Sequence, residues 1–544
     1  MYGPHLALFS LADLRIGAQF LCGLPAFLRN PIGLDEARAT LQRRLERREP
    51  DFLHVVRRAI YQHPGSPYRP LLDLAGCEYG DLERLVKEDG VEETLRKLYR
   101  HRVYLTVDEF KGKRSIARGN TTYAVNPSLF HNPLSASHVP ARSSGSRSSG
   151  TPALIDLAFV RDCAVNKSLA LNARGGIGWS HALWCVPGGG AIVQLLRVSG
   201  FGAPWVHWFS QVDPSALGLH PRYRWSERIL QWASLWSGVP LPRPRYVPLA
   251  DPLPIASWMS EVLRTGGTPN LFTFPSSAVR LCRAAFESRV DLGGAYFTTV
   301  GEPFTEARLA VIRRSGARAA PRYSSIESGP VGYACLAPAS PDDLHVLHDL
   351  QALIQPGPDG HTHGLPGDAL LISSLRPTAP FILLNVSLGD QGVLARRTCG
   401  CPLERLGWTT HLHTIRSYEK LTAGGMTFLD TDLIRVLEEV LPARFGGAPT
   451  DYQLVEEEAA DGQPRLRLLV HPAVGLLDSG TVADAFLSAI SRGSGSERVM
   501  GLAWRAANFL HVERRPPLVT ATGKILHLHA ERRPLSGTDS GSST

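Results

Sequence analysis

The sequence has no apolar run long enough to cross a membrane and no cysteine pattern typical of a disulfide-stabilised protein. A membrane-spanning helix needs about 20 apolar residues, and Asp13 and Arg15 interrupt even the apolar N-terminal stretch. The eight cysteines are spread over 544 residues, with Cys399 and Cys401 as a close pair, which is not a disulfide framework. Because a basic segment and a small-residue cleavage site are also missing, we expect no signal peptide, no membrane span and a cytoplasmic protein.

Lysine is scarce, since only seven of the 58 basic residues are lysine and the others are arginine. The formal net charge is +8, but the arginines are scattered and interleaved with glutamate, as in residues 43–48. That pattern is typical of solvated helix faces. Because zinc-finger spacing of the DNA-binding type and an RNA-binding aromatic signature are both missing, we expect no nucleic-acid partner. A diffuse positive field would also suit phosphate-bearing small molecules.

Apolar runs alternate with helical patterns between about 190 and 390. The runs AIVQLLRV (191–198), GAYFTTV (294–300) and ALLISSL (369–375) predict buried strands, and 257–266 and 304–316 predict helices. This alternation favours an α/β architecture with parallel strands. Just upstream, TPALIDLAF (151–159) predicts a strand and 161–172 a helix.

The pattern changes near residue 417. The strand-like segments 453–458 and 466–472, together with a helical pattern near 481–492, indicate a small α+β domain. The polar composition of the C-terminal end is typical of a disordered tail. We therefore expect a large domain over 1–416, a small domain over 417–530 and a disordered tail over 531–544.

A Ser/Gly run, SSGSRSSG (143–150), precedes the predicted strand at 151–159. Backbone N–H groups and hydroxyls of such a loop can bind phosphate oxygens. The same composition is typical of a flexible linker, and the GK[ST] ending of a Walker loop is missing. The run therefore leaves two interpretations open.

Five further motifs follow in order. They are GEP (301–303), YSSIE (323–327), SLGDQG (387–392), TIRSYEKLTAGG (414–425) and TATGKI (520–525). This ordered set resembles the adenylate-forming superfamily of acyl-CoA synthetases, over nearly the whole chain. The N-terminal segment 52–82 and the pair Cys399 and Cys401 look most like its phenylacetate–CoA ligase-like branch. The resemblance implies a large N-terminal domain of mixed sheets with packed helices, and a small mobile C-terminal α+β domain.

The resemblance implies that ATP and Mg²⁺ activate a carboxylic acid to an acyl-adenylate with release of pyrophosphate. Lys524 would stabilise the charge that develops between the acid and the α-phosphate, and Glu327 would hold Mg²⁺. Asp390 would accept hydrogen bonds from the ribose hydroxyls. The implied ATP-binding residues are Ser143, Ser144, Gly145, Ser146, Arg147, Ser148, Ser149, Gly150, Gly301, Glu302, Pro303, Tyr323, Ser324, Ser325, Asp390 and Arg416.

The chain departs from the family pattern at three places. Ile326 stands where a threonine is common, Tyr418 and Glu419 occupy the hinge, and the Ser/Gly run has two extra residues with Arg147 among them. These departures leave open the alternative that the protein is a degenerate homologue, which binds a nucleotide but does not catalyse a reaction. Under a purely structural interpretation, Lys524 is an ordinary exposed lysine. Because it stands in the segment TATGKI, which matches the family motif, it favours an active enzyme.

The acceptor implied by the branch is CoA, and Gly424 and Gly425 match the loop used in the thioester-forming step. A carrier-protein thiol or an amine, as in secondary metabolism, stays open as the acceptor. Trp205, His207, Phe297, Thr298 and Thr299 are candidates for a pocket that takes an aryl or apolar acid. Ordinary core aromatics are the alternative interpretation of this set.

Cys399, Cys401, His411 and His413 carry the ligand atoms of a tetrahedral structural zinc site. Their spacing is not that of a standard zinc knuckle. The alternative is that the two histidines simply line a strand.

Overall fold

The computed structural model describes residues 11–136, 138–142, 152–203, 205–213, 221–418, 421–423, 426–428, 430–458, 464–490, 510–520 and 523–531. The chain divides into two compact units, of which the first ends at Ser417 and the second begins at Tyr418. The predicted phosphate loop 143–150, Glu419, Gly424, Gly425 and the tail beyond residue 531 lie outside the described residues. No helix in the described part of the chain is both long and apolar enough to cross a membrane.

The large unit is built on a twelve-stranded sheet with the order β13-β14-β15-β16-β12-β11-β10-β9-β8-β5-β6-β7. From β10 to β7 the neighbouring strands run parallel, and from β11 to β13 they pair antiparallel. The strands are β1 Ile116–Arg118, β2 Thr121–Tyr123, β3 Val139–Arg142, β4 Pro152–Ile155, β5 Ser180–Cys185, β6 Trp205–Ser210, β7 Pro244–Tyr246, β8 Pro269–Thr273, β9 Tyr296–Val300, β10 Arg318–Ser325, β11 Gly329–Ala334, β12 Leu344–Val346, β13 Gln351–Ile354, β14 Ala369–Ser374, β15 Val386–Arg396 and β16 Thr410–Ser417.

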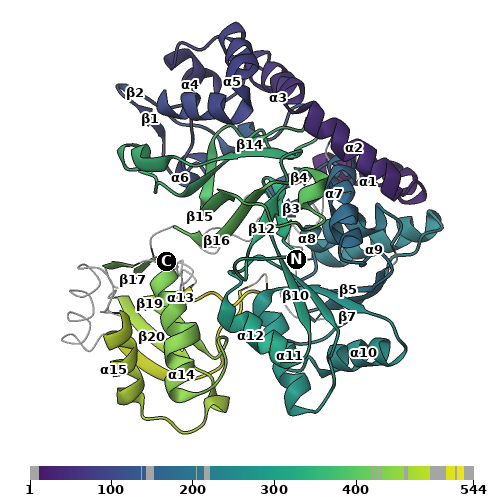
Figure 1. Cartoon of the computed structure of the whole chain (residues 1–544), viewed down its shortest axis with the longest axis vertical. Coiled ribbons are helices and arrows are strands. Elements are labelled where there is room, and N and C mark those ends of the chain that lie inside the picture. The colour runs from purple at the N-terminus through teal and green to yellow at the C-terminus, as the bar shows by residue number, and fades with distance from the viewer. Residues whose placement is uncertain are drawn as a thin grey trace, which may run out of the picture. The chain divides into compact units, whose positions relative to one another are not determined.

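Helices cover both faces of the parallel half of this sheet (Figure 1). One buried cluster joins the sheet to α7 and α8, and another joins it to α10, α11 and α12. The helices are α1 Leu11–Arg29, α2 Leu34–Glu46, α3 Arg48–Val56, η1 Arg57–Tyr61, α4 Arg69–Leu74, α5 Tyr79–Arg100, α6 Val107–Phe110, η2 Pro127–Phe130, α7 Leu157–Asn172, α8 Gly189–Ser199, α9 Pro221–Trp236, α10 Leu253–Arg264, α11 Pro275–Glu287, α12 Glu306–Arg314, η3 Gly357–His363 and η4 Glu404–Leu406. The predicted α/β fold class is thereby confirmed.

Two local predictions were wrong in this region. The run 191–198 lies in helix α8 and not in a strand, because an apolar run that is buried all round has no period that separates the two. Helix α7 begins at Leu157 and not at 161, because the Asp156 carboxylate accepts a hydrogen bond from Ala158 N at 2.8 Å and caps the helix.

The small unit has a four-stranded sheet with the order β21-β20-β19-β22. Apolar residues of its helices, such as Leu437 and Phe486, share one core with sheet residues such as Leu468. Its elements are β17 Leu421–Ala423, β18 Met426–Phe428, α13 Asp430–Arg435, η5 Val436–Val440, α14 Leu441–Phe445, β19 Tyr452–Glu458, β20 Pro464–Val470, η6 Pro472–Val474, α15 Ser479–Ile490, β21 Leu510–Arg514 and β22 Leu528–Glu531.

Candidate functional site

The turn between β10 and β11 carries the predicted magnesium ligand. Glu327 is only 5 % exposed, and no described residue forms a hydrogen bond or ion pair with its carboxylate. A buried carboxylate without a partner is costly, so this side chain is suited to a cation. Ser325 closes the turn, because its Oγ accepts a hydrogen bond from Ser328 N at 2.8 Å. Ile326 packs against the apolar cluster beneath α7 and α8, so its position supplies no hydroxyl.

Two predicted nucleotide residues are in contact, one near the end of β10 and the other within β15. The Tyr323 hydroxyl donates a hydrogen bond to Asp390 Oδ2 at 2.7 Å, although 67 positions separate them in the sequence. Both side chains keep partial exposure. Asp390 pairs across the sheet with Ser417, the last residue of the large unit. The carboxylate and the phenol ring therefore lie together where the chain leaves the large unit.

Glu302 and Arg416 have protein partners. The Glu302 carboxylate is 1 % exposed, forms an ion pair with Arg308 at 2.7 Å and accepts hydrogen bonds from Ser276 N and Oγ at 2.9 and 2.8 Å. This side chain fixes the loop at 301–303 instead of facing a ligand. The Arg416 guanidinium donates to Asp342 Oδ2 at 3.0 Å, so binding a nucleotide would require it to leave or share that carboxylate.

Lys524 lies in a tight turn of the small unit. Thr520 holds both ends of the turn: its N donates to Lys524 O at 2.8 Å, and its Oγ1 accepts from Lys524 N at 3.0 Å. Gly523 has φ +83°, a value that favours glycine. The buried Gln453 side chain clamps the surrounding loop through Leu518 N and O and Leu526 O, at 2.6, 3.0 and 2.7 Å. Sequence reasoning missed Gln453, which reads there as a polar residue of a strand.

The five predicted acyl-pocket residues do not line one pocket. Phe297 is fully buried in the core shared with α10, α11 and α12, and the His207 ring packs edge-on against Trp258 of α10 at 5.3 Å. Trp205 packs against the opposite cluster, below α7 and α8. Successive residues of a strand face opposite sides of a sheet. Thr299 therefore lies on the same face as Phe297, and Thr298 lies on the other face.

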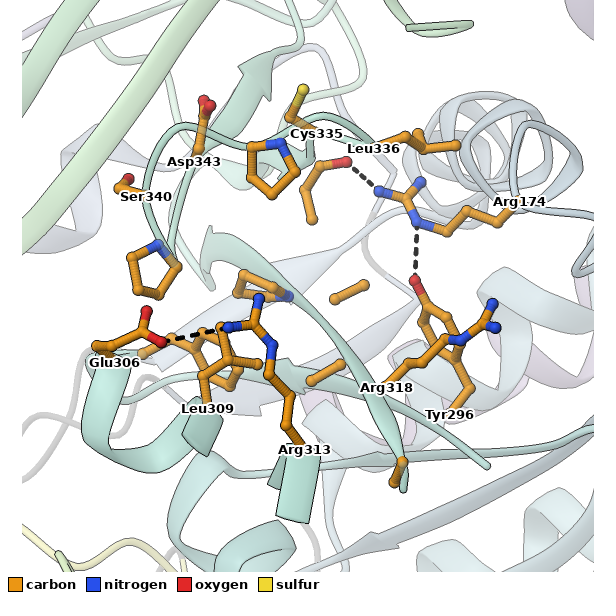
Figure 2. A pocket seen from close by; sticks show the side chains of 18 of the residues that line it. Arg174, Tyr296, Glu306, Leu309, Arg313, Arg318, Cys335, Leu336, Ser340 and Asp343 are labelled. Atoms are coloured by element: carbon orange, nitrogen blue, oxygen red, sulfur yellow. Dashed lines mark hydrogen bonds and ion pairs between the residues drawn. The ribbon is translucent and has the colours of Figure 1, made fainter. Parts of the chain in front are cut away.

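A cavity of about 490 Å³ lies between β10, α12 and the loop after β11 (Figure 2). At its rim Arg174 donates hydrogen bonds to the Tyr296 hydroxyl at 3.2 Å and to Ala334 O, and Glu306 pairs with Arg313 at 3.2 Å. None of the residues predicted from the sequence is among the described residues that line it, so it is distinct from the nucleotide candidates. Cys335 forms part of its wall.

Cys335 belongs to a buried cluster of cysteine and histidine side chains. One ligand atom each of Cys335, His345, Cys399 and His411 lies within 4.8 Å of the others. The His345 Nδ1–H faces Trp408 O at 2.6 Å, which leaves Nε2 directed at Cys399 Sγ and Cys401 Sγ, at 3.6 and 3.2 Å. Burial lowers the pKa of His345 to about 4 and keeps this ring neutral.

The second ring is oriented in the same way. His411 Nδ1 faces Asp343 Oδ1 at 2.7 Å, and its buried Nε2 has no hydrogen-bond partner in the described part of the chain. Metal-binding histidines almost always engage their other nitrogen with a carboxylate or carbonyl. Donor atoms around a zinc ion with bonds of about 2.0–2.3 Å lie roughly 3.3–3.8 Å apart, so a small contraction of the cluster would fit the ion.

Two of the four predicted zinc ligands, Cys401 and His413, are not among the four clustered residues. His413 is not in the cluster, because its Nδ1 contacts the neighbouring Thr414 Oγ1 at 2.9 Å in an exposed position. Cys335, directly after β11, and His345 of β12 join it instead, and neither forms a recognisable sequence motif. Cys399 and His411 stay, with Cys401 beside them.

No protein-family model and no curated protein matches the sequence. Solved structures do match. 2-Hydroxyisobutyryl-CoA ligase in the postadenylation state with 2-HIB-AMP matches at a TM-score of 0.52 and 13 % identity, covering 90 % of this chain and 89 % of that one. The same ligase with R3-HIB-AMP matches at a TM-score of 0.51 and 15 % identity, with the same coverage. The chain has the fold of an adenylate-forming ligase. The predicted resemblance is confirmed at the level of the fold.

Proposed function

We propose that this protein uses ATP and Mg²⁺ to convert a carboxylic acid to an acyl-adenylate, and then transfers the acyl group to the thiol of CoA. The observation that carries the proposal is the contact of Tyr323 with Asp390, together with the buried carboxylate of Glu327 in the turn after β10, which has no partner among the described residues. A ring that can stack on adenine, a carboxylate suited to a vicinal diol and a carboxylate suited to Mg²⁺ thus belong to one sheet region. The fold supports it, since similar structures hold acyl-adenylates.

The proposal gives each side chain one task. Glu327 holds the cation that neutralises the phosphates, and Asp390 accepts hydrogen bonds from the ribose. Lys524 stabilises the negative charge that grows as the acid attacks the α-phosphate. Ser325 takes the place of the missing threonine hydroxyl at position 326.

The test is pyrophosphate release with ATP, Mg²⁺ and a panel of aryl and aliphatic acids, with and without CoA. Lys524→Ala should slow acid-dependent release about 10²- to 10³-fold, which is the cost of losing one electrostatic stabiliser. Lys87→Ala is the matched control, because Lys87 is exposed on α5 and forms an ion pair with the exposed Glu83 one helical turn away.

The products of the reaction identify the acceptor of the acyl group. Thioester that forms only with CoA supports CoA as the acceptor, whereas acid-dependent release that ignores CoA favours a carrier protein or an amine. A protein that binds ATP yet releases no pyrophosphate with any acid would contradict the proposal and favour a degenerate homologue.

We also propose that Cys335, His345, Cys399 and His411 bind a structural zinc ion. The ion would join the end of β11 and strand β12 to β16 and the segment before it. Two imidazole nitrogens and two thiolates form a tetrahedral set without an open position, as in structural zinc sites. The oriented rings and the unpartnered Nε2 of His411 support this proposal.

Metal analysis of the purified protein tests the zinc proposal. We expect about one zinc per chain, loss of zinc and a lower unfolding temperature in Cys399→Ser, and no change in Cys22→Ser, which alters an exposed cysteine of α1. A metal-free protein with a disulfide among Cys335, Cys399 and Cys401 would show that the cluster is a redox site.

A further inference from the structure

A strip of polar side chains lies in the buried layer between the large sheet and helices α7 and α8. The Thr298 hydroxyl donates to Asn270 Oδ1 at 3.0 Å, and Asn270 Nδ2 contacts His181 Nδ1 at 3.0 Å. Arg322 of β10 donates to Gln194 Oε1 of α8 at 2.9 Å. The strip runs across the adjacent strands β10, β9, β8 and β5, in a layer that apolar side chains normally fill.

Three of the residues in this layer are cations without an acid. Lys167, Arg197 and Arg322 are only 4, 3 and 5 % exposed. Among the described residues, no side-chain hydrogen bond or ion pair reaches Lys167 or Arg197, and the Nε atoms of Arg197 and Arg322 lack partners. Burial, Arg322 and Arg197 all lower the pKa of Lys167 well below its usual value. Buried charges are normally paired, so this cluster lacks an anion.

The aromatic neighbours do not supply that anion. The Phe272 ring lies 5.4 Å from Lys167 Nζ and 5.1 Å from Arg322 Cζ, and the Trp205 ring lies 5.9 Å from Lys167 Nζ. Cation–π contacts of this kind are weaker than a hydrogen-bonded ion pair. The rings form apolar walls around the charges and leave them unneutralised.

The cluster is near the turn that carries Glu327. A Cβ atom on Gly329, just after this turn, would lie 2.6 Å from Phe159 and 3.8 Å from Cys163 Sγ, both on α7. Lys167 is one helical turn beyond Cys163 and eight residues beyond Phe159, about 12 Å along the helix axis. The flexible four-carbon stem of Lys167 shortens this gap, and a diacid with a chain of several methylenes can bridge the rest.

We propose that Lys167, Arg197 and Arg322 bind an anionic group at the far end of the acyl substrate. The inference rests on the proposed function and narrows it: the preferred acids carry a second carboxylate, or another anion, remote from the carboxylate that is adenylated. The same cations disfavour acids with an ammonium group at that end. The predicted aryl or apolar body of the substrate would contact Phe272 and Trp205.

Binding without turnover gives the first test. Unfolding temperatures are measured with adipate, with hexanoate as its monoacid of equal length, and with sodium sulfate. Adipate should raise the unfolding temperature of the wild type and of the control Lys87→Met, but not of Lys167→Met or Arg197→Met. Equal effects of adipate and hexanoate would overturn the proposal. Protection by sulfate without protection by adipate would also overturn it, because the site would then take a free anion.

Turnover gives the second test. The ratio of kcat/KM for a diacid to that for the matched monoacid should fall about 10- to 100-fold in Lys167→Met, mainly through the KM of the diacid, since a charged hydrogen bond is lost. An unchanged ratio would refute the assignment. If adipate binds through Lys167 yet no acid releases pyrophosphate, the adenylation proposal fails while the anion site stands, so the two failures can be told apart.

Discussion

Arg308 and Lys167 are both buried cations of the large unit, with 1 and 4 % exposure, but their surroundings are opposite. Arg308 contacts the Glu302 carboxylate at 2.7 Å, whereas the charged groups that act on Lys167 are Arg322 and Arg197. Arg44, which is 5 % exposed, resembles Arg308, since it pairs with Asp162 and Asp349. The fold therefore supplies acids to buried arginines where the charge serves structure.

The difference separates two uses of a buried charge. A paired cation brings its counter-ion with it, and removing one partner leaves the other unpaired in a medium of low dielectric constant. An unpaired cation already carries that cost in the free protein, and a ligand of opposite charge removes it. Stability measurements should therefore give opposite signs for the two groups.

The largest effect is expected from Glu302→Gln. The substitution removes the Glu302 carboxylate from Arg308, and breaking such a buried pair costs about 3–5 kcal/mol. Urea denaturation measures the free energy of unfolding. The exposed pair of Glu306 and Arg313 supplies the control, and Glu306→Gln should change the free energy of unfolding by less than about 1 kcal/mol. Equal effects of the two substitutions would remove the contrast between buried and exposed pairs.

Lys167→Met should act in the opposite direction. Without ligand at pH 7 we expect the variant to be more stable than the wild type by about 1–4 kcal/mol, the range for replacing buried charges by apolar groups. Because the folded pKa of Lys167 is lowered, the unfolded chain binds more protons between that pKa and the ordinary value near 10.4. The wild type then gains stability as the pH rises through this window, by at most about 1.4 kcal/mol per pH unit.

The measurement is therefore a series of urea denaturation curves for both proteins at increasing pH. The advantage of Lys167→Met should shrink as the pH approaches 10.4. A variant that is less stable than the wild type at every pH would mean that Lys167 has a structural partner, and the comparison with Arg308 would collapse.

The sequence predicted the chemistry of single segments better than the tertiary contacts between segments. The strand β9 and helix α12 follow from local periodicity. The motifs around Tyr323 and Asp390 can each be recognised in the sequence alone. The contact between these two side chains depends on how β10 and β15 are placed in the sheet. The pairing of Glu302 with Arg308 was missed for the same reason, because it turns a predicted ligand-facing carboxylate inward.

Lys167 illustrates a signal that was present and not used. Lysine is scarce in this chain, and Lys167 is one of the seven lysines, in the middle of an apolar helix pattern. Cys335 and His345 could not have been predicted from the sequence, since no spacing rule connects them to Cys399. The antiparallel pairing of β11, β12 and β16 brings these residues together.

The smallest effect is expected at Tyr323. Tyr323→Phe removes the hydroxyl that donates to Asp390 and keeps the ring. A hydrogen bond to a partly exposed carboxylate contributes about 0.5–1.5 kcal/mol, which predicts a rise in KM for ATP of roughly 2- to 12-fold with little change in kcat. Tyr246→Phe, at an exposed tyrosine of β7, is the control. If Tyr323→Phe lowers the unfolding temperature while KM for ATP stays constant, the phenol only supports the sheet; if KM rises alone, Tyr323 orients Asp390 for the nucleotide.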